Sequence, residues 1–190
     1  LISFKISNIT LKSKTIIFFK FIYNEIMTII IKNKETLIYD DFIFKCCVGK
    51  NGITKNKKEG DKKTPAGLYN LENLYFRDDR VKRPITFLKC IPIHKKMGWC
   101  DDVTNKNKYN KLINVKKNVR HEKLFRKDNI YDFLIPISYN RKKRVVGKGS
   151  AIFIHLTNNY KKTEGCIGLK KNDFLILLKL INKKTKIRII

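Results

Sequence analysis

A histidine and a cysteine close together in the chain are the residues best suited to chemistry. His155 ends an apolar stretch, and Cys166 follows it after a short polar segment. A cysteine becomes a strong nucleophile when a neighbouring imidazole takes its proton and lowers the thiol pKa from about 8.5 toward neutrality. Folded against each other, the two residues form a catalytic pair. The alternative is that each is a buried structural residue, as free cysteines commonly are.

The elements on either side of the pair favour a contact between them. Residues 151–156 are apolar and rich in Ile and Phe, which is typical of a buried strand. The polar segment 156–162 predicts a chain reversal that brings Cys166 back beside that strand. Gly165 removes a side chain directly before the nucleophile and permits a positive φ. Backbone N–H groups in such a turn can stabilise an oxyanion, worth roughly 3 kcal/mol per donor in a dry site.

Several motifs around this pair resemble one known family. Gly-Ser-Ala-Ile-Phe-x-His over 149–155, followed by Thr-x-Gly-Cys-Ile over 163–167, is similar to the active-site signature of the L,D-transpeptidases, the YkuD-type cysteine enzymes of bacterial peptidoglycan. Gly-Asp-x-x-Thr-Pro-x-Gly over 60–67 resembles an early motif of the same family. The resemblance extends from about Thr28 to the end of the chain.

A central block resembles one branch of this family. Its motifs are Gly98-Trp99-Cys100-Asp101-Asp102, Tyr109-Asn110, His121-Glu122-x-Leu124-x-Arg126 and Tyr131-Asp132. An aromatic ring and carboxylates in a cleft suit a substrate's ammonium groups, whereas adjacent aspartates also cap turns, perform acid–base chemistry or bind cations. His121 is the main rival to His155 as the functional imidazole. The candidate substrate-binding residues are Trp99, Asp101, Asp102, Tyr109, Asn110, His121 and Arg126, with Thr163 and Glu164 beside the nucleophile.

The chain departs from the family pattern at two positions near the cysteine. Much of the family has a second His where this chain has Glu164, and an Arg where it has Gly168. That Arg helps to orient substrate in relatives, so the donor specificity of this chain is left open. Arg126 is a candidate substitute.

The resemblance implies a fold and a reaction. The fold is mainly β, a YkuD-type β-sandwich with short helices and one C-terminal helix. Cys166 would attack a tetrapeptide stem at the L-centre of diaminopimelate, expel the terminal D-alanine and form a thioester. His155 would take the thiol proton, the N–H groups of Gly165 and Cys166 would hold the oxyanion, and Thr163 would shape the loop. Transfer to an amine gives a cross-link, and transfer to water makes the protein an L,D-carboxypeptidase.

The residues themselves also predict a strand-dominated domain. Short β-branched and aromatic runs predict strands over 28–31, 36–39, 42–48, 68–71, 131–139 and 186–190. Pro136 favours an edge or a bend in the fifth of these. A short helix is predicted over 122–126, and a longer one up to Asn182 with Asn172 as its N-cap. Residues 27–190 are long enough for one domain with its own core.

Residues 1–26 differ from the rest and are predicted to be an N-terminal extension. Their apolar patch at 16–19 is too short to span a bilayer, and no small-residue cleavage site follows it. The chain opens on Leu, and Met27 stands directly before the family-like part, so we expect Met27 to be a natural start. That start favours a cytoplasmic location, whereas the family's function favours the periplasm or cell envelope of a bacterium.

The formal net charge of +27 normally suggests an anionic partner. Most of the basic residues are Lys, and the chain is also rich in Ile, Asn, Phe and Tyr, the residues of AT-rich codons. No nucleic-acid-binding motif accompanies the charge, so no nucleic acid partner is expected. The expected partners are peptidoglycan stem peptides, and a non-catalytic basic binding module is the alternative from another class.

The five cysteines include no Cys-x-x-Cys pair. Neither a zinc site nor a disulfide framework is therefore expected, and no cofactor is predicted. A metal site formed by His155, Cys166 and Asp101 is a further rival interpretation.

Overall fold

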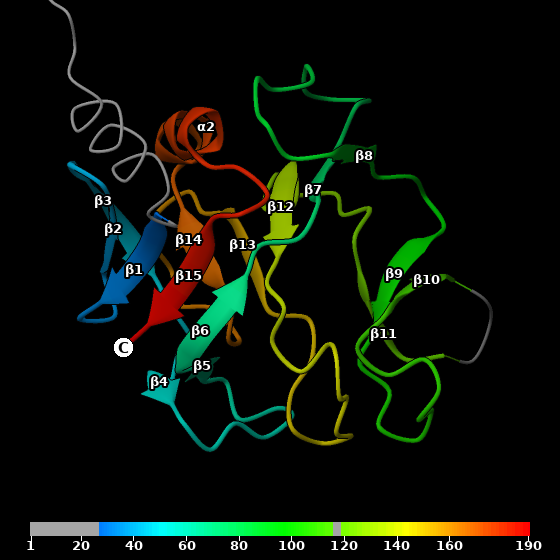
Figure 1. Cartoon of the computed structure of the whole chain (residues 1–190). Helices are drawn as coiled ribbons and strands as arrows, with labels where there is room; N and C mark the ends of the chain where they lie inside the picture. The colour runs from blue at the N-terminus through cyan, green and yellow to red at the C-terminus, as the bar shows by residue number, and fades with distance from the viewer. Residues whose placement is uncertain (1–26, 116–118) are drawn as a thin grey trace, which may run out of the picture.

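The computed structural model describes residues 27–115 and 119–190 and shows a mainly β architecture (Figure 1). Ten strands form one sheet in the order β6-β15-β1-β2-β3-β14-β13-β12-β7-β8. The predictions made for residues 1–26 lie outside the described residues. The strands of this sheet are β1 (Thr28–Lys32), β2 (Thr36–Tyr39), β3 (Phe42–Cys47), β6 (Gly67–Asn70), β7 (Leu74–Phe76), β8 (Cys90–Pro92), β12 (Phe133–Pro136), β13 (Phe153–Leu156), β14 (Ile167–Leu169) and β15 (Lys186–Ile189).

The three strands predicted over 28–31, 36–39 and 42–48 are confirmed, and together they form an antiparallel meander. β1 pairs antiparallel with β2, and β2 with β3. The turn residues Asn33, Lys34 and Asp40 all have positive φ, which the tight hairpins require. The meander then joins the rest of the sheet through β3, which pairs with β14.

One helix, α2 (Lys171–Leu180), lies within the described residues and covers the sheet beside β13 and β14 (Figure 1). It buries Phe174, Leu177 and Leu178, and Phe174 stacks on Phe133 of β12 with ring centroids 6.0 Å apart. The predicted C-terminal helix is therefore confirmed, but the N-cap is Lys170 rather than Asn172 and makes no side-chain cap hydrogen bond. No helix among the described residues is long and apolar enough to cross a membrane.

A second, three-stranded sheet stands beside the end of the large sheet where β7, β8 and β12 lie (Figure 1). It consists of β9 (Met97–Cys100) between β10 (Leu112–Asn114) and β11 (His121–Lys123). The predicted helix over 122–126 is thus wrong. Pairing of His121 and Glu122 with Cys100 and Trp99 of β9 overrides their local preference.

Two further details concern the strands that precede the site. β12 is shorter than predicted and lies inside the sheet, between β13 and β7, so Pro136 does not mark an edge. Pro136 is its last residue, where a missing N–H disturbs the ladder least. The short parallel pair β4 (Ile53–Thr54) and β5 (Thr64–Pro65) encloses a loop that reaches the candidate site.

Candidate active site

The parallel pairing of β13 with β14 positions the nucleophile candidate. Ile154 pairs with Ile167 and His155 with Gly168, so Cys166, just before β14, lies beside Phe153. The N–H of Phe153 donates to the Cys166 Sγ at 3.3 Å. Since alternate residues of a strand share a face, Phe153 and His155 project to the same side of β13. The sheet register thus brings the two predicted residues to one side of the fold.

Both residues line one cavity of about 490 Å³. Its wall also contains Thr163, Glu164 and Gly165 from the turn before β14, and two more distant candidates, Asp101 and Arg126. The remaining lining includes charged and polar residues that were not among the predicted site residues. Three of them, Glu122, Tyr131 and Ser150, belong to the family-like motifs, and Lys57, Glu59 and Arg120 do not.

The Cys166 side chain is in the form of a neutral thiol. Its Sγ donates to the carbonyl oxygen of Ala151 at 3.2 Å and accepts from Phe153, so neither hydrogen bond involves His155. Burial raises the pKa of Cys166 to about 12, although the Phe153 N–H favours the thiolate. The candidate nucleophile is therefore not pre-ionised in the free protein.

His155 is also neutral. Its Nδ1 lies 2.8 Å from the carbonyl oxygen of Leu156. Since a carbonyl only accepts, Nδ1 carries the proton and Nε2 is left as a proton acceptor. Burial lowers the pKa of His155 to about 4, against the opposing effect of that hydrogen bond. The ring packs edge-on against Tyr131, with ring centroids 5.4 Å apart, which fixes its orientation.

The turn that carries Cys166 is closed by Thr163. Its Oγ1 donates to the Cys166 carbonyl oxygen at 2.7 Å and accepts from the Gly165 N–H at 3.1 Å. Gly165 has a φ of 140°, and a Cβ there would lie 2.9 Å from the Lys63 carbonyl oxygen, so only glycine fits. Thr64 of the early Gly-Asp motif donates to the Gly165 carbonyl oxygen at 2.9 Å. That motif supports the turn.

The two N–H groups predicted to hold the oxyanion, those of Gly165 and Cys166, differ in whether they already donate a hydrogen bond. The Gly165 N–H already donates to Thr163. The Cys166 N–H donates to no acceptor among the residues that the structure describes. In this conformation, Cys166 therefore offers the free donor.

Asp101, Arg126 and Glu164 occupy different parts of the cavity wall. The Asp101 Oδ2 lies 3.4 Å from Arg120, and its buried Oδ1 has no hydrogen-bond partner among the residues that the structure describes. Burial raises the pKa of Asp101. Arg126 is held by Asp128 at 2.6 Å, so its charge is partly neutralised. Glu164 also lines the cavity, and its side chain is mostly exposed.

Trp99 and Asn110 lie behind the cavity wall rather than on it. Trp99 is 1% exposed, packs edge-on against Phe153 at 5.2 Å, and donates from Nε1 to the Asn110 Oδ1 at 2.9 Å. The same oxygen accepts from the Ala151 N–H at 3.2 Å. Trp99 and Asn110 therefore contact Phe153 and Ala151, the two residues whose backbone groups bond the Cys166 thiol.

The other candidates have structural partners as well. The Tyr109 hydroxyl donates to the Glu59 Oε2 at 2.5 Å. Asp102 accepts from both the N–H and the hydroxyl of Thr104, the turn-capping alternative. His121 lies in β11 with Nδ1 2.7 Å from the Val119 carbonyl oxygen, and it is not part of the cavity lining.

The comparison with known families decides the assignment. A family model described as YkuD, L,D-transpeptidase catalytic domain, matches residues 24–189. The chain belongs to this family. A comparison with curated proteins gives no match.

Solved structures resemble this L,D-transpeptidase domain at low identity. They include Bd1075 from Bdellovibrio bacteriovorus (15% identity, TM-score 0.46, covering 87% of this chain and 48% of that one). The helical cell shape determining protein Pgp2 from Campylobacter jejuni shows 20% identity and a TM-score of 0.47, covering 86% of this chain and 47% of that one. L,D-transpeptidase 1 from Mycobacterium tuberculosis shows 9% identity and a TM-score of 0.41, covering 87% of this chain and 59% of that one. The chain thus spans about half the length of these proteins, and the assignment rests on the family model.

Sequence reasoning missed part of the cavity wall of this L,D-transpeptidase domain. Lys57 and Glu59 belong to the segment 51–63, whose polar, Lys-rich composition favours a solvated loop, yet Lys57 is only 4% exposed. The one available signal was the spacing of Lys57 and Asp61 just before the Thr-Pro motif, and in a Lys-rich loop that spacing indicates little.

The described residues contain no group of three or more His, Cys, Asp or Glu side chains that could hold a metal ion. The proposed alternative of a metal on His155, Cys166 and Asp101 has no such cluster to support it. The five cysteines, all in the described part of the chain, are free.

Proposed function

We propose that this domain is a peptidoglycan L,D-transpeptidase that forms an acyl-enzyme on Cys166 and transfers the acyl group to an amine. One observation carries the proposal: in a chain of this family, adjacent parallel strands present Cys166 and His155 to the same cavity. The donor is a tetrapeptide stem, and the cell envelope, where cross-linkable peptidoglycan lies, is the place of action.

The neutral pair suggests when the nucleophile forms. In the free protein the thiol proton points to the Ala151 carbonyl, and His155 keeps Nε2 unprotonated. When the donor stem fills the cavity, the thiol proton passes to His155 as sulfur attacks the carbonyl carbon. The carbonyl oxygen becomes negatively charged and accepts a hydrogen bond from the free N–H of Cys166. Collapse of this intermediate breaks the bond to D-alanine, whose nitrogen takes the proton from His155, and leaves a thioester.

The second half of the reaction reverses these roles. An acceptor amine attacks the thioester carbonyl and gives its proton to His155. The carbon–sulfur bond then breaks, and the departing sulfur of Cys166 recovers that proton. If water replaces the amine, the same steps give an L,D-carboxypeptidase, so the acceptor decides the reaction class.

The products distinguish the activities. The wild-type protein and Cys166→Ala are incubated with tetrapeptide and pentapeptide muropeptides, and products are identified by mass spectrometry. Dimers that require Cys166 support the transpeptidase, whereas shortened monomers alone establish the carboxypeptidase. If neither forms, the enzyme proposal fails, and a basic binding module, with affinity that falls steeply as salt rises, replaces it.

A further inference from the structure

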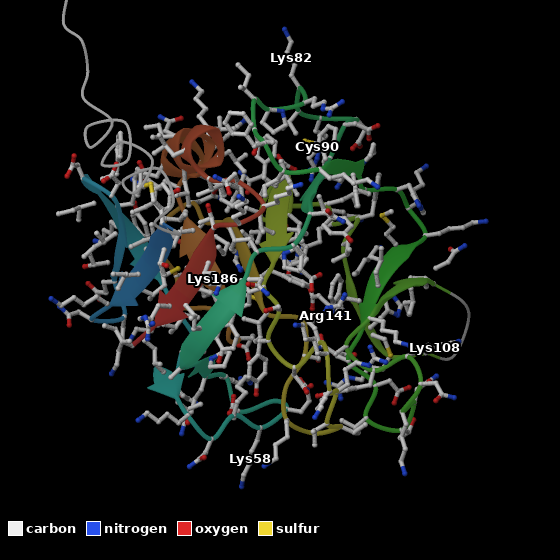
Figure 2. The ribbon with its side chains drawn as sticks, viewed as in Figure 1. Lys58, Lys82, Cys90, Lys108, Arg141 and Lys186 are labelled. Carbon is white, nitrogen blue, oxygen red and sulfur yellow. The ribbon has the colours of Figure 1, made fainter. Side chains whose placement is uncertain are left out.

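Lys57 is an unusual component of the cavity wall. Its side chain is 3% exposed, although lysines are almost never fully buried unless paired. It lines the same cavity as Cys166. The adjacent Lys58 is exposed instead and points away from the body of the protein (Figure 2). One lysine of this loop is therefore held inside the site.

The Lys57 ammonium is fixed in place with one donor to spare. Its Nζ donates to the Asp61 Oδ1 at 2.5 Å and to the Lys58 carbonyl oxygen at 2.8 Å. An ammonium group has three N–H donors. The third has no acceptor among the residues that the structure describes. It is available to a ligand.

Asp61 holds the ammonium rigidly. Its Oδ1 also accepts from the Lys63 N–H at 2.9 Å, and its Oδ2 from the Lys58 N–H at 2.8 Å. Burial would raise the pKa of Asp61, but these bonds and Lys57 together lower it, so the carboxylate stays ionised. The stem of Lys57 packs on Gly149, where a Cβ would lie 2.8 Å from the Lys57 Cγ.

The other cations of the cavity are less suited to recognise an anion. Arg126 and Arg120 pair with Glu122 and Asp101, which themselves line the cavity and would repel an anion there. Asp61, the partner of Lys57, does not line the cavity. Lys161 and Lys162 are exposed, where salt screens their charge. Lys57 is a buried cation with a free donor, and its charge opposes the effect of burial on the Cys166 thiol.

We propose that Lys57 is a specificity-determining residue that binds the terminal carboxylate of the donor stem peptide. This inference rests on the proposed function. The bond attacked by Cys166 joins the terminal residue to the stem, so the terminal carboxylate is only about one residue, roughly 4 Å, from the reacting carbonyl. It is the ligand anion that must enter the cavity wherever the carbonyl reaches Cys166. A charge-assisted hydrogen bond in a buried site then rewards a free carboxylate over an amide.

Binding to the unreactive Cys166→Ala variant tests this assignment by calorimetry. The ligands are a tetrapeptide stem with a free terminal carboxylate and the same peptide with a terminal amide. The parent is expected to bind the acid at least about tenfold more tightly, the range of a charged hydrogen bond. A second variant adds Lys57→Met together with Asp61→Asn, because Asp61 would otherwise be left without its cation. This double substitution is expected to reduce the ratio to about twofold or less. Affinity for the amide stays unchanged.

A matched control tests whether the loss of any lysine from this loop has the same effect. Lys55→Met removes an exposed lysine of the same loop that does not line the cavity and should leave the ratio unchanged. Equal losses for both peptides would show a structural role for Lys57 and overturn the proposal, as would a parent with no preference for the acid. Since no chemistry is needed, a carboxylate preference without acyl-enzyme in the wild type refutes the proposed function alone.

Discussion

At the scale of single residues, burial keeps both members of the proposed catalytic pair, Cys166 and His155, in their neutral forms. The same low-dielectric environment raises the pKa of the Cys166 thiol to about 12 and lowers that of His155 to about 4. Each shift favours the neutral form. The pair thus differs from a thiolate–imidazolium pair that exists before substrate binds, and its activation depends on the ligand.

This state predicts the pH dependence of Cys166 alkylation in the free protein. A group titrates to its reactive anion as pH rises toward its pKa, so the rate should increase about tenfold per pH unit from pH 7 to 10 without a plateau. Site-resolved mass spectrometry after timed iodoacetamide treatment measures it. A plateau near neutral pH would mean that a thiolate is already present and would contradict the neutral pair.

At the scale of elements, the turn between β13 and β14 matters most. Thr163 joins both sides of this turn, because one hydroxyl bonds the Cys166 carbonyl and the Gly165 N–H. The Cys166 backbone, including the N–H assigned to the oxyanion, takes its position from these two hydrogen bonds.

Thr163→Val therefore tests the turn with little change of shape. Loss of both hydrogen bonds should cost about 1–3 kcal/mol of unfolding free energy and reduce the rate of acylation. Thr163→Ser keeps the hydroxyl and should retain most of both. Urea denaturation and single-turnover acylation measure the two effects. If Val and Ser behave alike, the hydroxyl does not hold the turn.

Some of the strands and the helix could be predicted from the sequence, and others could not. The β1–β3 meander and the helix were predictable, because their apolar periodicity and turn residues are local signals. The strand at His121–Lys123 was not, because its pairing with β9 depends on residues distant in sequence. The burial of Lys57 was equally hidden, since its partner Asp61 neutralises it only once the loop is folded.

The candidate site was also predictable only where local sequence signals determine it. Cys166 and His155 belong to one short stretch with a strand and a turn, so their proximity followed from local pattern. Trp99 and Asn110 were predicted to bind substrate. Their contact with Phe153 and Ala151 rather than with the cavity depends on how the two sheets pack, which no local pattern shows.

At the scale of the whole molecule, the site depends on the junction of the two sheets. Arg141 lies between them (Figure 2), pairs with Glu72 at 2.8 Å and covers the ring of Trp99 at 4.6 Å. Asn110 completes the junction, since it accepts from Trp99 and Ala151 and donates to the carbonyl oxygens of residues 139 and 140.

Asn110→Ala should therefore weaken the whole domain. The substitution leaves several buried polar groups unpaired and places Ala at a φ of 54°, so we expect a loss of roughly 2–4 kcal/mol in unfolding free energy. Exposed Asn114→Ala on β10 is the matched control and should change it by less than about 0.5 kcal/mol. Thermal and urea denaturation measure both. Equal stability of the two variants would contradict the junction's role.

The proposed acylation of Cys166 is measured by intact-protein mass spectrometry after incubation with a tetrapeptide stem. We expect the wild-type mass to increase by the mass of the stem minus that of its terminal D-alanine, peptide mapping to place the adduct on Cys166, and Cys166→Ala to gain no mass. An adduct that persists in Cys166→Ala, or none on wild-type protein that binds the peptide, would contradict it.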